Sequence, residues 1–73
     1  MMEITEGAAT YKPTNRVRQI RHEQFMTMED LAKKAGVHFQ TVVRVEHGHP
    51  AKAGTIRKIA DALGVEPNEL AQL

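Results

Sequence analysis

The most constraining feature of the sequence is a pair of short helical segments separated by only a few residues. Thr27-Met28-Glu29-Asp30 has the pattern of an N-terminal capping box, in which a hydroxyl and an acidic side chain each bond the other residue's backbone. Gly36 follows where a left-handed residue would end the helix. A second helical segment over residues 39–46 comes directly after it, so the chain must turn sharply. The pattern predicts a helix-turn-helix between residues 27 and 46.

Three further segments carry helical signals. A helix from residue 14 to about residue 24 would place Val17 and Ile20 on one side. Residues 55–63 form an amphipathic pattern, and Pro67 suits the first turn of a short fifth helix. No strand pattern is visible. The sequence therefore predicts an all-α fold, a compact bundle of about five short helices.

The chain has 73 residues, enough for one small domain. Residues 1–13 lack helical periodicity and contain Gly7 and Pro13, so we expect an N-terminal arm that is flexible or only locally ordered. The helix-turn-helix domain is then predicted to cover residues 14–73.

Positive charge is concentrated in the middle of the chain. Residues 12–52 hold eight Lys and Arg against four Asp and Glu, a net +4 in a chain whose net charge is +1. A protein that binds a polyanion needs such a concentration. The alternative is that these side chains only solvate the outer faces of helices.

Several function classes have little support in the composition. The chain contains no cysteine and no serine, so thiolate metal sites and these two nucleophiles are excluded, and we expect no enzyme activity and no cofactor. His38, His47 and His49 lie close in sequence, but without cysteine or an obvious second shell they do not predict a metal site. No apolar run is long enough to span a membrane and no signal peptide is visible, so we expect a cytoplasmic protein without a membrane partner or a small-molecule substrate.

Five short motifs follow one another along the chain. They are Thr27, Asp30-Leu31-Ala32, Gly36-Val37, Glu46-His47-Gly48 and Ile59-Ala60-Asp61-Ala62-Leu63-Gly64-Val65. In this order and spacing, from about residue 14 to residue 70, the chain resembles the XRE-like helix-turn-helix domains of phage lambda-type repressors and Cro. The resemblance implies that the third helix enters the major groove of DNA.

The matching positions make Phe39, Gln40, Val43 and Arg44 the base-contacting residues. Their chemistry suits that role. Glutamine can bond adenine N6 and N7, arginine can bond guanine O6 and N7, and apolar groups can pack on thymine methyls. For Phe39 two alternatives remain, because its ring could fold back on Met28 or enter a dimer contact.

The resemblance also implies a set of phosphate contacts. The amide end of the second helix at Thr27 and Met28, together with Thr41, matches positions that grip phosphates. Family members often carry Gln where Met28 stands, so one side-chain contact is expected to be missing. Lys52 is a further candidate for electrostatic attraction to the backbone.

Arg21 and Glu46 match a pair that ties the first helix to the end of the recognition helix, and we predict a partly buried structural ion pair between them. Three departures from the family pattern concern helix ends, one of them being that no Ser, Asp or Asn cap stands between Gly48 and the fourth helix, which leaves Gly54 to serve. Phe25 stands where glycine commonly ends the first helix, and His38 stands where serine or threonine commonly caps the recognition helix. These departures put local geometry in doubt rather than the fold.

The expected function is sequence-specific binding of double-stranded DNA by a small transcriptional regulator, acting as a repressor. The alternative is a protein-interaction module or an antitoxin on the same fold, because the exposed arc of the third helix mixes polar and apolar residues. A single small domain reads a short half-site, so we expect a homodimer on a two-fold operator. Leu70 and Leu73 could form dimer contacts or complete the core of the monomer.

Overall fold

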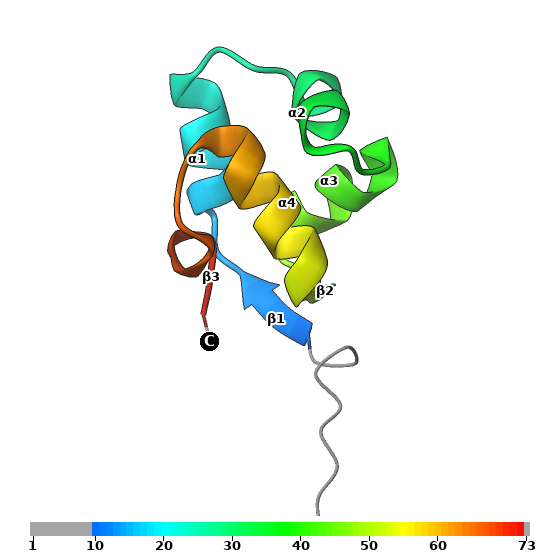
Figure 1. The fold of residues 1–73 in the computed structure, drawn as a ribbon, viewed down its shortest axis with the longest axis vertical. Helices are drawn as coiled ribbons and strands as arrows, with labels where there is room; N and C mark the ends of the chain where they lie inside the picture. Colours follow the sequence, from blue (N-terminus) through cyan, green and yellow to red (C-terminus); the bar gives the residue numbers. More distant parts are fainter. Residues whose placement is uncertain (1–9, 73) are drawn as a thin grey trace, which may run out of the picture.

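The computed structural model describes residues 10–72. Four α-helices make up most of the fold in these residues (Figure 1). The helices are α1 (Arg16–Glu23), α2 (Met28–Ala35), α3 (Phe39–Glu46) and α4 (Ala53–Leu63). The remaining elements are the strands β1 (Thr10–Pro13), β2 (Ala51–Lys52) and β3 (Ala71–Gln72) and the 3₁₀-helix η2 (Pro67–Glu69). No helix within residues 10–72 is both long and apolar enough to cross a membrane.

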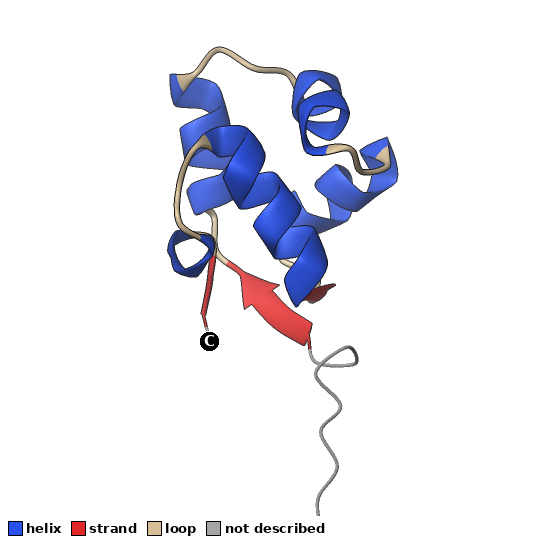
Figure 2. Ribbon diagram, in the orientation of Figure 1, coloured by secondary structure: helices blue, strands red, loops and turns tan. Residues whose placement is uncertain are grey.

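The three strands form an antiparallel sheet in the order β2-β1-β3, at one end of the helical bundle (Figure 2). Tyr11 pairs with Ala51 and Pro13 pairs with Ala71. The predicted compact helical bundle with a helix-turn-helix is therefore confirmed in part: the fold is mostly helical, but it is not strictly all-α. Each strand has at most four residues, too few for an alternating pattern to stand out, and β1 finds its partners some forty and sixty residues further along the chain.

The fifth helix is also different from the prediction. It is a single 3₁₀ turn, because the chain leaves helical geometry after Leu70 and enters β3 at Ala71. Pairing with β1 and the bond from the Thr14 amide to the Leu70 carbonyl, 2.7 Å long, hold the chain in this extended course.

The predicted arm falls partly in the sheet and partly outside the described residues. Residues 10–13 form β1, the middle strand of the sheet. Residues 1–9 lie outside the described part of the chain, and the division into an arm and a domain at residue 13 stays a prediction.

The core lies between the four helices. Its buried apolar residues are Val17, Ile20, Leu31, Ala32, Val42, Val45, Ile56, Ile59, Ala60, Ala62, Leu63, Leu70 and Ala71. Leu70 is fully buried, so it completes the core of the monomer and is not available as a dimer contact. Leu73 lies outside the described residues.

Three helix ends follow the local signals closely. The capping box at the start of α2 is present, with the Asp30 amide 3.0 Å from the Thr27 hydroxyl and the Thr27 amide 3.0 Å from the Asp30 carboxylate. Gly36 ends α2 and Gly64 ends α4, both in the left-handed conformation that glycine adopts without strain.

Candidate nucleic-acid interface

The start of α3 is set by the turn after α2. Gly36 adopts a φ of 71°, and the Val37 amide donates to the Ala32 carbonyl over 3.0 Å, which directs the chain back across α2. His38 is the N-cap of α3, and its side chain makes no capping hydrogen bond. Helix α3 is therefore positioned by packing and by the turn rather than by a side-chain cap.

One side of α3 is anchored in the core. Val42 and Val45 are buried, and they fix the rotation of the helix about its own axis. On the opposite side Gln40 and Arg44 are exposed and lie one turn apart. The exposed side of α3 that carries Gln40 and Arg44, called the arc below, is therefore held in a fixed orientation by the buried side of the helix.

The four residues predicted to contact bases lie together on this helix, but with different accessibility. Gln40 and Arg44 are exposed, and 39% of Phe39 is exposed. Val43 is half-buried, so only part of its side chain could meet a thymine methyl group. Whether these residues touch bases stays a prediction.

A surface hollow of about 400 Å³ lies beside this arc. It is lined by Gln40, Thr41 and Arg44 of α3 and by Thr55 at the start of α4, among others. Thr55 also lines a second hollow, of about 690 Å³, together with Lys52 and the other cations Arg57 and Lys58. Lys52 is exposed on β2, and so a path of polar and basic groups runs from α3 to the start of α4.

The capping box limits what the start of α2 can offer to an anion. The Thr27 amide donates to the Asp30 carboxylate, and the Asp30 amide donates to the Thr27 hydroxyl. The Thr27 amide, and after it the Thr27 hydroxyl, stabilise the ionised carboxylate and hold the pKa of Asp30 below its ordinary value. The first N–H groups of a helix lack partners within the helix, so the amides of Met28 and Glu29 are the ones that remain for an outside acceptor.

Arg21 and Glu46 form a two-pronged ion pair between α1 and the end of α3. The Arg21 Nη2 atom lies 2.9 Å from Glu46 Oε1, and Arg21 Nε donates to Glu46 Oε2. The remaining guanidinium nitrogen, Arg21 Nη1, donates to the Met26 carbonyl over 2.8 Å. Only 9% and 6% of the two side chains are exposed, so this network fixes the end of α3 against α1 and the α1–α2 link.

Two polar contacts were not predicted from the sequence. The Gln24 side-chain amide donates to the Leu63 carbonyl over 2.8 Å, which ties the end of α1 to the end of α4. His47 Nδ1 lies 2.7 Å from the Val43 carbonyl oxygen at the end of α3. The second contact joins residues four apart on one helix, so helical spacing could have indicated it. Within residues 10–72, no three His, Asp or Glu side chains gather closely enough to hold a metal ion.

Comparison with known proteins decides the family. Residues 17–70 match the model of a helix-turn-helix family. The chain belongs to this helix-turn-helix family, in its lambda-repressor (XRE) type. The resemblance predicted from the motifs is therefore confirmed. No curated protein sequence matches the chain.

The solved structure of another protein has a fold similar to that of the present chain. It is the restriction-modification controller protein C.AhdI from Aeromonas hydrophila, at 34% sequence identity and a TM-score of 0.71. The match covers 75% of the present chain and 85% of C.AhdI. Together with the family, this neighbour supports a coarse function: the protein is a DNA-binding transcriptional regulator whose partner is double-stranded DNA.

Proposed function

We propose that this helix-turn-helix protein is a repressor that binds a specific double-stranded DNA site with α3 in the major groove. The observation that carries the proposal is the orientation of α3. Its buried valines and the Arg21–Glu46 pair lock the helix, while Gln40 and Arg44 project from the opposite side. A helix held this way can present a fixed pattern of hydrogen-bonding groups to base edges.

Base recognition is divided between the polar and apolar residues of the arc. Arg44 pairs with guanine and Gln40 with adenine, each as a bidentate contact that contributes about 1 to 3 kcal/mol of discrimination. Phe39, at the start of the helix, packs on a thymine methyl group, and Val43 contributes the accessible part of its side chain.

Phosphate contacts flank the groove on both sides of α3. The amides at the start of α2, next to Thr27 and Met28, bind one phosphate, and Thr41 binds another. Lys52 extends the contact along the path between the two surface hollows. These contacts position α3 and supply affinity that does not depend on sequence.

The protein binds its operator as a homodimer, because one domain of this size reads too short a site for tight specific binding. The dimer contact is not Leu70, which is buried in the core. Sedimentation of the protein alone and with a selected duplex tests this proposal. Two chains per symmetric site are expected, and a strict ratio of one chain per duplex would contradict it.

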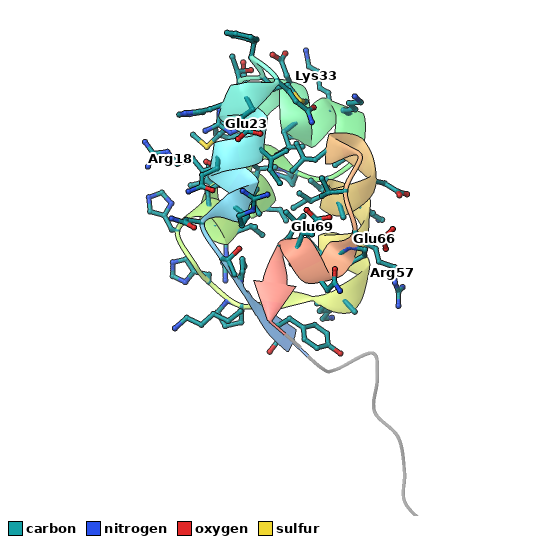
Figure 3. The ribbon with its side chains drawn as sticks, turned by 90° about the vertical axis from the view of Figure 1, so that its left-hand side faces the viewer. Arg18, Glu23, Lys33, Arg57, Glu66 and Glu69 are labelled. Carbon is teal, nitrogen blue, oxygen red and sulfur yellow. The ribbon has the colours of Figure 1, made fainter. Side chains whose placement is uncertain are left out.

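The test of DNA binding uses a fluorescent random-sequence duplex over a salt series, followed by selection of a preferred site. Arg44→Ala is compared with Arg18→Ala, which removes the same charge from the outer side of α1, where Arg18 projects away from the bundle (Figure 3). Affinity is expected to fall steeply with salt. On the selected site Arg44→Ala should lose roughly 10-fold or more in affinity and should relax specificity at one base pair, whereas Arg18→Ala should retain specificity.

Repression itself needs a separate test. A reporter with the selected site overlapping its promoter is expected to lose expression when the protein is produced, and to regain it with the Arg44→Ala variant. Activation of the reporter would contradict the repressor role without affecting the proposed DNA binding.

A second candidate function is recognition of a protein partner, as in an antitoxin. The observation that favours it is the 39% exposed Phe39 ring on the arc. Absence of DNA binding even at low salt, with the protein folded, would favour this candidate over the first.

A further inference from the structure

His47 occupies the end of the face that α3 presents outward. It is the C-cap residue of α3 and is exposed. It follows Gln40 by seven residues, so the two positions differ by only about 20° around the helix axis and by roughly 10 Å along it. If Gln40 reads a base in the groove, His47 lies where the helix leaves the groove and meets the DNA backbone.

A hydrogen bond determines which ring nitrogen of His47 points outward. Nδ1 lies 2.7 Å from the Val43 carbonyl oxygen, which can only accept, so Nδ1 carries a hydrogen. The other nitrogen, Nε2, is then free to contact a partner. It is an acceptor when the imidazole is neutral and a donor when the imidazole is protonated. A phosphate oxygen also only accepts, and so protonation converts an unfavourable approach into a charge-assisted hydrogen bond.

The charged groups around this end of α3 do not supply a competing acceptor for Nε2. Glu46, the neighbouring carboxylate, is bonded through both oxygens to Arg21 of α1. Arg44 and His49 lie within three residues of His47 in the chain. Helix α1, which contacts α3, carries the exposed Arg16, Arg18, His22 and Glu23, and none of them is hydrogen-bonded to the His47 ring. On α2, Lys33 and Lys34 lie in the last turn, which leads into the opposite end of α3.

We propose that His47 is a further DNA-contacting residue, which donates from Nε2 to a backbone phosphate when its imidazole is protonated. The inference rests on the proposed function, because it places α3 against DNA. The protonated form binds more tightly, so affinity is gained as the pH falls and is lost as the pH rises.

The test compares the wild type with His47→Gln on one random-sequence duplex at pH 6 and pH 8 at constant ionic strength. Glutamine keeps a donor at every pH and carries no charge. The wild type is expected to bind roughly 3- to 10-fold more tightly at pH 6, and the slope of log affinity against log salt is expected to steepen by about 0.9. His47→Gln should show neither change. His22→Gln, His38→Gln and His49→Gln are matched controls that should keep both.

The outcomes separate this inference from the proposed function. Absence of binding at every pH would overturn DNA binding itself. Binding at pH 8 without the gain at pH 6, or a gain that persists in His47→Gln, would overturn only the role of His47. Nitrogen NMR of the free protein is an independent check, since a neutral ring with its hydrogen on Nε2 would contradict the assignment. Equal thermal unfolding of His47→Gln and the wild type, or the same result with His47→Asn, excludes a purely structural effect.

Discussion

Phe25 combines two costs that a residue seldom carries together. Its φ of 57° lies in the left-handed region, and 95% of the residue is exposed. Its amide donates to the His22 carbonyl over 3.0 Å, and the next amide, that of Met26, donates to the Arg21 carbonyl over 3.1 Å. These bonds close the end of α1 in the manner of a C′ glycine. The phenyl ring gains no packing in return for the backbone strain.

Phe25→Gly should therefore stabilise the protein. A left-handed conformation costs a residue with a Cβ atom about 1 to 2 kcal/mol, and part of the gain is offset by the greater freedom of glycine in the unfolded chain. We expect the free energy of unfolding to rise by about 1 kcal/mol in urea denaturation. Gly36→Ala, at a φ of 71°, is the matched control and should shift stability in the opposite direction. A loss of stability in Phe25→Gly would mean that the ring contributes packing.

Asp30 gives a second residue-scale prediction, on pH. The amide and then the hydroxyl of Thr27 lower its pKa, and the nearby Lys33 adds to the effect. A carboxyl whose pKa is lower in the folded state contributes stability above its unfolded pKa, ordinarily near 3.8 for aspartate, and that contribution is lost as the pH falls through the folded pKa. The stability difference between the wild type and Asp30→Asn should be larger at pH 6 than at pH 3. Urea midpoints at the two pH values measure it, and an unchanged difference would contradict the prediction.

At the scale of elements, the buried ion pair connects three parts of the fold that the core alone would not lock together. Arg21 on α1 reaches Glu46 at the end of α3 and the Met26 carbonyl in the α1–α2 link. Two buried charges are costly to desolvate, so the pair contributes more to the position of α3 than to net stability. In the proposed function, the pair matters because it fixes the direction of the side of α3 that carries Gln40 and Arg44.

Removing one partner of this ion pair should lower the stability of the protein far more than replacing both partners. Glu46→Leu leaves the Arg21 charge buried without its carboxylate and should lower the free energy of unfolding by about 3 kcal/mol. The double variant with Arg21→Met should recover a large part of that loss, because no charge is stranded. Denaturation of the two single variants and the double variant measures the coupling. Losses that simply add in the double variant would contradict the interpretation.

At the scale of the whole molecule, what could be predicted from the sequence depended on how local the signals are. The capping threonine and the glycine at residue 36 act within one turn of α2, so the helix-turn-helix was readable, as was the outward side of α3. The sheet was not readable, because β1 is defined by partners far along the chain. Within the site, the capping bond between the Thr27 amide and Asp30 could also be predicted, because it spans only three residues, whereas the base and phosphate contacts remain predictions.

The sheet itself should matter to the whole molecule, because β1 joins the link before α4 to the C-terminal segment. Its pairing with β2 holds the chain next to Lys52, and its pairing with β3 covers the region around Leu70.

We compare deletion of residues 1–9, which leaves β1 intact, with deletion of residues 1–12, which removes nearly all of it. The longer deletion should lower the free energy of unfolding by about 2 kcal/mol relative to the shorter one, because several backbone hydrogen bonds and the packing of Tyr11 are lost together. It should also weaken DNA binding, since the segment that carries Lys52 is no longer held. Denaturation and duplex titration of the two truncated chains measure both effects, and equal behaviour would mean that the helices alone position the interface.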